Sequence, residues 1–532
     1  MLKAIFALLL IISLLISGCG NAPTPDSPAD SPTKPTTGSS TTPQVPNHPS
    51  NPGTCSQHVD DDNNTVCDLC SSTVFVYFDF YAINDLHGKL ADGSNHPGVD
   101  ELTTYLKNAK KNDENAIFIS SGDMWQGASE SNLTSGKIVT DWMNEMDFAG
   151  MALGNHEFDW GTDAIKENHK IADFPFLAIN IYDRDTNKRV DYCAPSVVVE
   201  GDGLQIGIIG AIGDCYSSIA VDKCQDVYFK TGRELTNLVK AEAQRLRDDG
   251  VDFIVYTIHD GYGQTRNGPV VPVTGSQISS YYDTSLSDGY IDLVFEGHTH
   301  QGYRLQDEYG VYHLQHRGDN KGGISHVEVA INTVTNTPSV RLAELVTTSE
   351  YDDLDDDPIV ESLLEKYEDQ ISIANQVVGF NGKRRSGDEM RQLVADMYYQ
   401  AGIERWGQEY DIVLGGGFIS VRSPGYLAYG DVTYGMLQAL FPFDNQLTLC
   451  SVKGRDLWKK FLNTDNDNYF ISYGDYGAEV YNNIDMNATY YIITDTYSAY
   501  YASNKLTVVA EYDAGVYARD LLADYMTAGG LE

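Results

Sequence analysis

Five short apolar segments, each ending in a side chain that can bind a metal ion, constrain the fold of this chain more than any other feature. The segments are rich in β-branched and aromatic residues, which is typical of buried β-strands. The predicted strands are residues 74–83, 116–120, 151–153, 253–258 and 291–295. An Asp, an Asn or a His lies just beyond the carboxyl end of every one of them.

Segments with helical character lie between the predicted strands, for example residues 234–247. Strands that alternate with helices indicate an α/β fold. In such folds, ligands bind in the crevice beyond the carboxyl ends of the strands. We therefore expect the polar side chains at the five strand ends to converge on one site.

The side chains at these strand ends form a set of oxygen and imidazole donors without cysteine. They are Asp85, His87, Asp123, Asn155, His259, His298 and His300. Such donors suit two divalent ions such as Mn, Zn or Fe, and a carboxylate such as Asp123 can bridge both ions. Two ions about 3.5 to 4 Å apart can hold a phosphoryl group and stabilise its leaving oxygen, so the set predicts phosphate ester hydrolysis.

Each of these features also has an ordinary structural explanation. A single Asp-x-His occurs by chance, and a single His at a strand end, such as His259, is usually a satisfied polar group. Gly-Asp after a strand is commonly a turn. Chance would have to produce all five strand ends together and in order, so the combination favours a metal site.

The charge of the chain excludes one class of substrate. Asp and Glu number 76 against 36 Lys and Arg, which gives a formal net charge of -40. Such a chain is not expected to bind polymeric nucleic acid. A small phosphorylated substrate is compatible with this charge, because bound cations reverse the field within one pocket. The length of 532 residues predicts two main domains.

The N-terminus predicts export and a lipid anchor. Residues 1–18 have the basic start, apolar run and small-residue ending of a secretory signal, and the following Cys19 completes a sequence that resembles the bacterial lipobox. The alternative is an ordinary signal peptide with an incidental cysteine. Residues 19–54 are rich in Pro, Ser and Thr and predict a disordered tether. We expect the protein on the extracellular face of the bacterial membrane, with the lipid as its only membrane contact.

A short segment rich in Cys, His and Asp, residues 55–73, follows the tether. Cys55, His58, Cys67 and Cys70 have the spacing of a structural zinc site, and the acidic residues between them could hold calcium. In an oxidising exterior the same cysteines could form disulfides instead. Both interpretations are open, and further along the chain a Cys215–Cys224 bridge is also possible.

The order of the strand-end motifs resembles that of the calcineurin-like metallophosphoesterases. More narrowly, it is similar to the 5'-nucleotidase and UDP-sugar hydrolase family, whose signature is matched by Gly-Asn-His-Glu-Phe-Asp at residues 154–159. The resemblance implies a four-layer α/β/β/α sandwich over residues 74–345. A second, α+β domain that selects the substrate would follow at residues 376–532.

The resemblance also implies roles for the matched residues. Asp85, His87, Asp123 and His300 would hold one ion, and Asp123, Asn155, His259 and His298 would hold the other. His156 would remain free of metal and would stabilise the phosphoryl transition state or protonate the leaving group. Asp159 would orient the imidazole of His156.

Between the domains, residues 346–375 predict a solvated acidic linker and a connecting helix at 359–370. The second domain resembles the C-terminal domain of 5'-nucleotidases. In that family a triple glycine lets the backbone approach the ligand, an Arg contacts phosphate, and two aromatic rings hold the base. The matching residues are Gly416, Gly417, Arg422, Phe443 and Tyr497.

This second domain departs from the family pattern at two places. The family has Asn immediately before the triple glycine and Arg two residues after it, where this chain has Leu414 and Ile419. The family's Gly-Gly-Asp-Gly after the second aromatic ring is replaced by residues 500–504. The sequence therefore supports the reaction class, phosphate ester hydrolysis, with more residues than it supports a nucleotide as the substrate.

The resemblance implies an extracellular enzyme that releases phosphate from nucleotides by a two-metal mechanism. Three alternatives stay open: a 2',3'-cyclic phosphodiesterase, a hydrolase of UDP-sugars or sugar phosphates, and a non-catalytic surface lipoprotein that binds nucleosides. A missing metal ligand would favour the non-catalytic alternative, and the sequence lacks none of them.

Overall fold

The computed structural model describes most of the chain from residue 66 onward. The described residues are 66–69, 71, 74–92, 98–264, 266–273, 282–318, 323–422, 424–463, 467, 469–474, 483–501 and 504–529. The signal peptide, Cys19, the tether, and Cys55, His58 and Cys70 of the short Cys-rich segment lie outside the described residues. None of the described helices is both long and apolar enough to cross a membrane.

The first domain contains two large β-sheets. The six-stranded sheet has the order β15-β14-β1-β2-β3-β4. Its strands are β1 (Phe75–Ile83), β2 (Ile117–Ser120), β3 (Phe148–Ala152), β4 (Phe176–Leu177), β14 (Ile324–Asn332) and β15 (Thr337–Val346). The strands from β1 to β4 are parallel, and β14 and β15 are antiparallel additions at one edge.

The seven-stranded sheet has the order β10-β12-β13-β11-β9-β7-β6. Its strands are β6 (Ser196–Gly201), β7 (Leu204–Ile212), β9 (Phe253–His259), β10 (Arg266–Pro272), β11 (Leu293–Glu296), β12 (Tyr303–Gln306) and β13 (Tyr312–Gln315). Its central strands β7, β9, β11 and β13 are parallel. All five strands predicted to carry ligands are therefore present, although β3 begins three residues before the predicted segment at 151–153.

One hydrophobic core fills the space between the two sheets. Side chains alternate between the two faces of a strand, so Phe78 and Phe80 of β1 enter this core while Tyr81 points to the opposite face. The opposing sheet contributes Phe253, whose ring centroid lies 5.7 Å from that of Phe80. This sheet-on-sheet packing forms the two inner layers.

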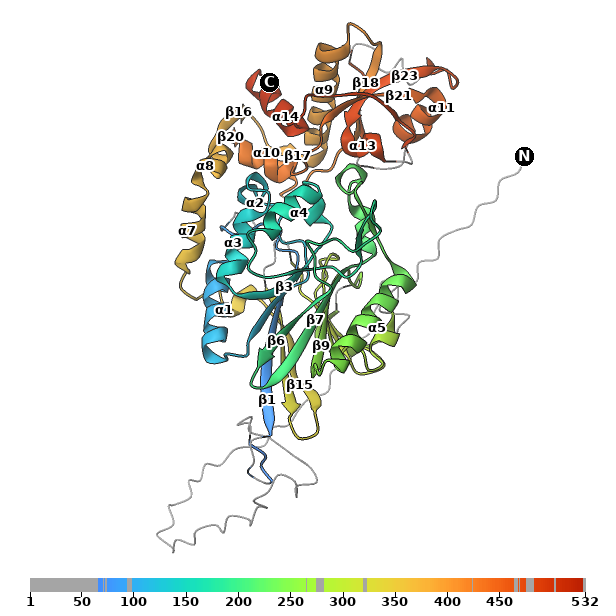
Figure 1. The fold of residues 1–532 in the computed structure, drawn as a ribbon. Coiled ribbons are helices and arrows are strands. Elements are labelled where there is room, and N and C mark those ends of the chain that lie inside the picture. The colour runs from blue at the N-terminus through green and yellow to red at the C-terminus, as the bar shows by residue number, and fades with distance from the viewer. Residues whose placement is uncertain are drawn as a thin grey trace, which may run out of the picture. The chain divides into compact units, whose positions relative to one another are not determined.

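Helices cover the outer face of each sheet and complete four layers (Figure 1). The six-stranded sheet is covered by α1 (Asp100–Asn112) and α3 (Lys137–Glu145), with the shorter α2 (Ser129–Leu133) and α4 (Thr162–His169) nearby. The seven-stranded sheet is covered by α5 (Gly232–Asp248), which buries Leu235, Val239 and Leu246 at helical spacing. The predicted α/β/β/α sandwich is confirmed.

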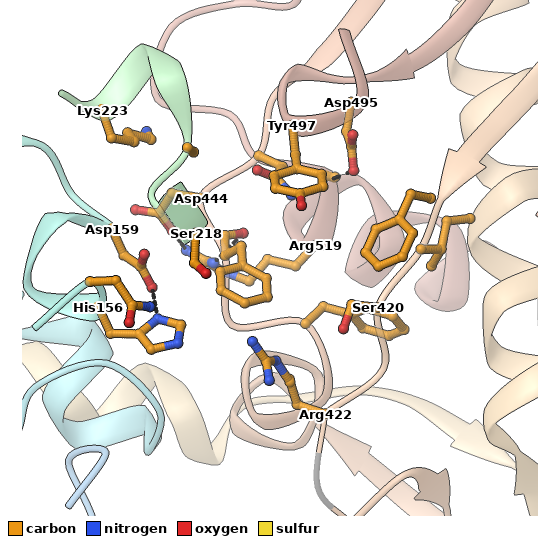
Figure 2. Close-up of a pocket in the computed structure, with 18 of the residues that line it drawn as sticks. His156, Asp159, Ser218, Lys223, Ser420, Arg422, Asp444, Asp495, Tyr497 and Arg519 are labelled. Carbon is orange, nitrogen blue, oxygen red and sulfur yellow. Dashed lines mark hydrogen bonds and ion pairs between the residues drawn. The ribbon is translucent and has the colours of Figure 1, made fainter. Parts of the chain in front are cut away.

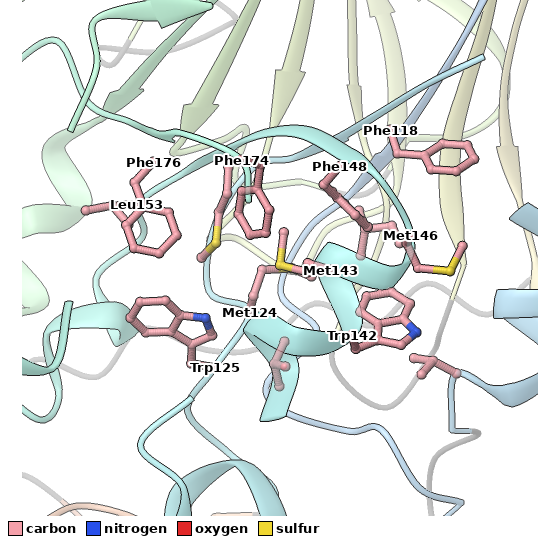
Figure 3. Packing of buried hydrophobic residues seen from close by; sticks show 14 of the residues in the cluster. Phe118, Met124, Trp125, Trp142, Met143, Met146, Phe148, Leu153, Phe174 and Phe176 are labelled. Carbon is pink, nitrogen blue, oxygen red and sulfur yellow. The ribbon is translucent and has the colours of Figure 1, made fainter. Parts of the chain in front are cut away.

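Large aromatic and Met side chains dominate the core beneath α3 (Figure 3). Trp142 of α3 packs on Phe148 of β3, with ring centroids 5.7 Å apart. Trp125, in the loop after β2, packs on Phe176 of β4 at 5.5 Å. This core thereby fixes the loop that carries Asp123 against the sheet.

The second domain contains a five-stranded sheet in the order β22-β18-β23-β21-β24. Its strands are β18 (Ile412–Phe418), β21 (Leu447–Lys453), β22 (Tyr469–Ser472), β23 (Thr489–Asp495) and β24 (Thr507–Glu511). One face packs against α9 (Gly387–Trp406), α10 (Tyr434–Leu440) and α14 (Ala518–Thr527), and the other packs against α11 (Gly454–Leu457) and α13 (Thr496–Tyr500). This is the predicted α+β arrangement.

Short strand pairs complete the described structure. They are β5 (Ile181–Asp183) with β8 (Val227–Phe229), β16 (Val377–Asn381) with β20 (Gly430–Thr433), and β17 (Arg385–Ser386) with β19 (Tyr426–Leu427). Cys215 and Cys224 are free thiols, so the bridge that their sequence separation allowed is absent.

The segment between the two domains differs from its prediction in two ways. The helix predicted at residues 359–370 is two helices, α7 (Pro358–Lys366) and α8 (Glu368–Ile371), which are separated at Tyr367. Tyr351, in the stretch predicted to be solvated, is only 2% exposed and belongs to the core beneath α1 and α3. The acidic stretch is therefore anchored to the first domain by an aromatic side chain.

The core between the sheets gives a stability prediction. Phe253 is 1% exposed. Phe253→Ala should lower the free energy of unfolding by about 3–5 kcal/mol, because it removes buried apolar surface and leaves a cavity between two rigid sheets. Urea unfolding followed by tryptophan fluorescence measures this change. Val198→Ala on the 40% exposed side chain of Val198 in β6 is the control and should change stability by less than about 0.5 kcal/mol. Equal losses in the two variants would contradict the packing argument.

Candidate active site

The predicted ligands converge at the carboxyl ends of the strands in both sheets. Donor atoms of Asp85, His87 and His300 lie within 4.8 Å of one another, and so do those of Asp85, Asp123 and His259. Asp85 belongs to both groups, so the two sets of donors adjoin. A third cluster joins His259 and His298 with the thiol of Cys215, which the sequence did not single out as a ligand. Asn155 lines the same cavity as Asp123 and His298, so all five strand ends contribute to one site.

Donor atoms of different predicted ligands lie close to one another in the site. His87 Nε2 and His300 Nε2 are 3.2 Å apart. His300 Nε2 also lies 3.2 Å from Asp85 Oδ1, and His259 Nε2 lies 3.0 Å from Asp123 Oδ2. Divalent cations bind such combinations of imidazole nitrogen and carboxylate oxygen.

Backbone carbonyls orient two of the imidazoles toward the site. His87 Nδ1 lies 2.7 Å from the carbonyl oxygen of Gln126, and His259 Nδ1 lies 2.6 Å from that of Ser121. A carbonyl oxygen can only accept a hydrogen bond, so each Nδ1 carries a proton, and each ring presents the lone pair of Nε2 once Nε2 has lost its proton to a bound cation's charge. This is the tautomer that binds a metal ion through Nε2.

Two atoms that could bind a metal ion are buried without a hydrogen-bond partner. Such unpaired atoms indicate whether the residues of the site fit metal ions. They are Nε2 of His259 and Oδ1 of Asn155. Asp123 Oδ2 is close to His259 Nε2, but their geometry is not that of a hydrogen bond. Buried polar atoms are nearly always paired, so atoms of this kind at a cluster of donors fit metal coordination.

Buried negative charge gives a second reason for cations. Asp85 and Asp123 are 0% and 1% exposed. Burial raises the pKa of the Asp123 carboxyl, but the neighbouring His259 outweighs burial and holds that pKa well below its usual range. Burial alone would lower the pKa of His259, but the Asp123 carboxylate outweighs burial and raises that pKa to about 10. The carboxylates therefore require nearby positive charge, which protons or divalent ions can supply.

Five of the seven predicted ligands adopt left-handed backbone conformations, which non-glycine residues seldom adopt. Their φ angles lie between 52° and 70° at Asp85, His87, Asp123, His298 and His300. Such strained residues persist only where the surrounding structure fixes them, and they cluster at functional sites. Each of these turns aims a ligand into the site directly beyond the end of a strand.

Gly154 makes room for one of these ligands. A Cβ atom at Gly154 would lie 2.2 Å from Asp123 Oδ1. That oxygen also accepts a hydrogen bond from the backbone N–H of His156 at 2.8 Å. Glycine is therefore required at residue 154 by the close approach of the Asp123 carboxylate.

Glu157 has a role that the sequence did not reveal. Its fully buried carboxylate accepts hydrogen bonds from the backbone N–H groups of Asp123 at 2.9 Å, Met124 at 2.8 Å and Gly154 at 2.6 Å. It thereby ties the loop after β2 to the loop after β3. The motif at 154–159 contains Glu157, but only the structure shows which N–H groups it binds.

His156 and Asp159 form a pair beside the donor cluster. His156 Nδ1 lies 2.8 Å from Asp159 Oδ2. Burial lowers the pKa of His156, but the carboxylates of Asp159 and Asp123 outweigh it and raise this pKa to about 9. The imidazole is therefore protonated at neutral pH and presents Nε2–H as a donor. His156 belongs to none of the donor clusters found among the described residues.

The site opens into a cavity of about 730 Å³ that the second domain helps to line (Figure 2). Asp123, Asn155, His156 and His298 lie on one side of it. From the second domain, Arg422, Phe443 and Tyr497 line the cavity. The shift of Arg422 from the family position therefore does not remove its side chain from the cavity.

The aromatic side chains of the cavity contact rings other than each other. The Phe443 ring stacks on His156 with centroids 6.1 Å apart, and the guanidinium of Arg422 lies 5.1 Å from the Phe443 centroid. Tyr497 packs against Phe418 at 5.7 Å and against Tyr501 at 6.2 Å. Phe418 and Tyr501, which the sequence did not single out, thus extend one aromatic wall.

The structure does not place Gly416 and Gly417 where the sequence predicted. Neither residue lines the cavity. A Cβ at Gly416 would lie 2.1 Å from the carbonyl oxygen of Phe470, and one at Gly417 would lie 2.6 Å from Thr494 Oγ1. Close packing of β18 against its neighbouring strands therefore explains these glycines.

Comparison with known proteins matches this description. Residues 78–302 match the family model described as calcineurin-like phosphoesterase. The chain is 25% identical to endonuclease YhcR of Bacillus subtilis over 71% of its own length and 32% of that protein. It is 25% identical to protein UshA of Yersinia enterocolitica, over 64% of its own length and 67% of that protein. It is 27% identical to a 5'-nucleotidase of Vibrio cholerae over 35% of its own length and 32% of that protein. The matches thus span about a third of endonuclease YhcR and about a third of the Vibrio cholerae 5'-nucleotidase.

Solved structures share the fold. A 5'-nucleotidase precursor from Thermus thermophilus superposes with a TM-score of 0.63 at 18% identity, over 85% of this chain and 96% of that one. A 5'-nucleotidase from Candida albicans superposes with a TM-score of 0.58 at 13% identity, over 85% of this chain and 98% of that one. Residues 78–302 thus match the calcineurin-like phosphoesterase model, and the chain shares its fold with solved 5'-nucleotidase structures.

Proposed function

We propose that this protein is a metal-dependent hydrolase of phosphoric esters that releases phosphate from nucleotides. The observation that carries the proposal is that buried carboxylates meet two imidazoles whose Nε2 atoms face the same site. The protonated ring of His156 lies beside them and belongs to no donor cluster of the described residues. The calcineurin-like phosphoesterase match over residues 78–302 supports the reaction class.

Two ions would divide the donors into two sets that share the Asp123 carboxylate, as the family resemblance implies, while the clusters in the structure overlap at the neighbouring Asp85. We assign Asp85, His87, Asp123 and His300 to one ion, and Asp123, Asn155, His259 and His298 to the other. Oxygen and imidazole donors of this kind suit Mn, Zn or Fe. When bound, the ions would supply Lewis acidity and positive charge to the phosphoryl group.

His156 would act on the substrate from outside the metal ligands. Its protonated ring, held by Asp159 at 2.8 Å, can donate from Nε2 to a phosphoryl oxygen or to the leaving oxygen. The backbone N–H of His156 also donates to Asp123 Oδ1, so its position is coupled to the shared carboxylate. The chain thus holds a proton donor beside the place where negative charge develops.

The cavity supports a nucleotide as the substrate. Phe443 and Tyr497 contribute aromatic surface to the cavity that the donors line, and stacking of a base on an aromatic ring contributes about 1–3 kcal/mol. Arg422 adds a positive charge to the cavity, 5.1 Å from the centroid of the Phe443 ring. Relatives named 5'-nucleotidase agree with this substrate class.

We also propose that the protein is anchored by a lipid on Cys19 at the extracellular face of the bacterial membrane. The signal-like residues 1–18, the sequence around Cys19 and the tether at 19–54 support this location.

Activity on a panel of phosphate esters tests the function. The purified protein, loaded with Mn or Zn, should release inorganic phosphate from AMP faster than from 4-nitrophenyl phosphate, because only the nucleotide presents a base to Phe443 and Tyr497. UDP-glucose and 2',3'-cyclic AMP test the two alternative substrate classes. Faster turnover of either one would replace the nucleotide assignment, and no metal-dependent hydrolysis of any ester would refute the enzyme itself.

A pair of variants separates metal binding from turnover. His156→Ala should keep the bound metal and lower turnover by about 10²-fold or more, because it removes a proton donor but no ligand. Asp123→Asn should lose metal, because it removes the carboxylate that both ions share. Metal analysis and phosphate release on the same preparations measure both effects. Loss of metal from His156→Ala would show that His156 is itself a ligand.

Cell fractionation tests the lipid anchor. Cys19→Ser should move the protein from the membrane fraction to the soluble fraction, because the thiol that would carry the lipid is absent. A variant with Ser in place of Cys215 is the matched control and should stay with the membrane. If Cys19→Ser stays there as well, the lipid anchor is wrong.

A further inference from the structure

The Phe443 side chain reaches the catalytic histidine from a loop. This loop connects α10, which ends at Leu440, to β21, which begins at Leu447. It contains no helix or strand of its own. The position of the ring above His156 therefore depends on side chains that hold the loop from outside.

Arg519 of α14 provides most of that support (Figure 2). Its Nη1 donates hydrogen bonds to the carbonyl oxygens of Pro442 at 3.2 Å and Phe443 at 3.1 Å. Its Nη2 forms an ion pair with Asp444. One guanidinium group thus binds three consecutive residues, and Phe443 is the middle one.

The guanidinium is itself fixed on its remaining side. Arg519 Nε donates to the hydroxyl oxygen of Tyr434 at 3.2 Å, and that hydroxyl donates to Asp520 Oδ1 at 2.5 Å. Tyr434 begins α10 and Asp520 lies in α14, so the network joins the two helices on either side of the loop. The Arg519 side chain is 6% exposed, and its charge is balanced by the partly buried Asp444.

Arg519 differs in this respect from Arg422, the other arginine of the cavity. All three nitrogens of the Arg519 guanidinium group bond to protein atoms. The guanidinium of Arg422 instead lies over the Phe443 ring, close enough to His156 to lower the pKa of its imidazole. Arg422 is therefore placed to meet an anionic substrate, whereas Arg519 is engaged with the loop.

We propose that Arg519 is a positioning residue for Phe443. It holds the Phe443 ring over His156, where a nucleobase can stack on the ring, and it thereby sets the affinity for nucleotides. This inference rests on the proposed function and adds the residue that determines its selectivity for a base. A planar guanidinium can bind two carbonyl oxygens and a carboxylate at once, and an ammonium group cannot reproduce that geometry.

Two substrates separate positioning from catalysis. AMP has a base to stack, and 4-nitrophenyl phosphate lacks the nucleoside. In the full chain loaded with metal, Arg519→Met should raise the KM for AMP by about tenfold or more, while kcat/KM for 4-nitrophenyl phosphate stays within about twofold. Arg519→Lys should fall between the wild type and Arg519→Met, because it keeps the charge but loses the fork of donors.

A double-mutant cycle identifies the residue through which Arg519 acts. If Arg519 acts through Phe443, Arg519→Met in a Phe443→Ala background should change the KM for AMP by less than about twofold. Arg405→Met is the matched control, because Arg405 forms an exposed ion pair with Asp513 in the same domain. It should leave the KM values for both substrates unchanged.

Distinct results would overturn this inference. Equal loss on both substrates in Arg519→Met and Arg519→Lys, with metal retained, would show that Arg519 serves the domain as a whole or the chemistry. Additive effects in the Phe443→Ala background would also refute a role through Phe443. If Arg519→Met does not fold, Arg519→Lys carries the same comparison. Failure of the proposed function looks different, because the wild type itself would then release no phosphate from AMP.

Discussion

Two carboxylates buried where two sheets end, Asp85 and Asp123, constrain the rest of the structure. Buried carboxylates are costly unless nearby cations or hydrogen-bond donors compensate them. Here the compensation comes from imidazoles on other strands, such as His259 at 3.0 Å from Asp123, and from backbone N–H groups. The two sheets must therefore present their carboxyl ends to the same place, which the α/β/β/α layering achieves.

The chain holds this arrangement under local strain. Five ligands have positive φ angles, and Asp123 fits only because residue 154 is glycine. Glu157 opposes the strain by binding N–H groups from both loops that surround Asp123. The large aromatic core beneath α3 packs against the same loops on the side of the six-stranded sheet. Packing and hydrogen bonding thus stabilise a geometry that the backbone alone would not adopt.

The donor groups that could bind metal could be picked out from the sequence, because the information for them is local. An apolar strand followed directly by Asp, Asn or His identifies both the element and the ligand, as at β1 and Asp85. The hydrogen bonds of Glu157 and the burial of Tyr351 depend on distant partners and have no local pattern. Arg519 lies 75 residues from Asp444, and a single Arg on a helix does not indicate its partner. The sequence alone could not show that Gly416 and Gly417 lie outside the cavity lining, because a glycine needed for strand packing and one needed for ligand approach have the same sequence pattern.

The contact between His156 and Phe443 brings together two systems that are otherwise built separately. The charge of His156 is set by Asp159 and Asp123 in the first domain. The place of Phe443 is set by Arg519 and Tyr434 in the second domain. A change at Asp159 can therefore alter the charge of His156 while the Phe443 ring stays in place. A change at Arg519 can move the Phe443 ring while the charge of His156 is kept. The departures from the family pattern at Leu414 and Tyr501 lie in the second domain, which holds Phe443. Such a division allows one phosphoesterase centre to serve different esters.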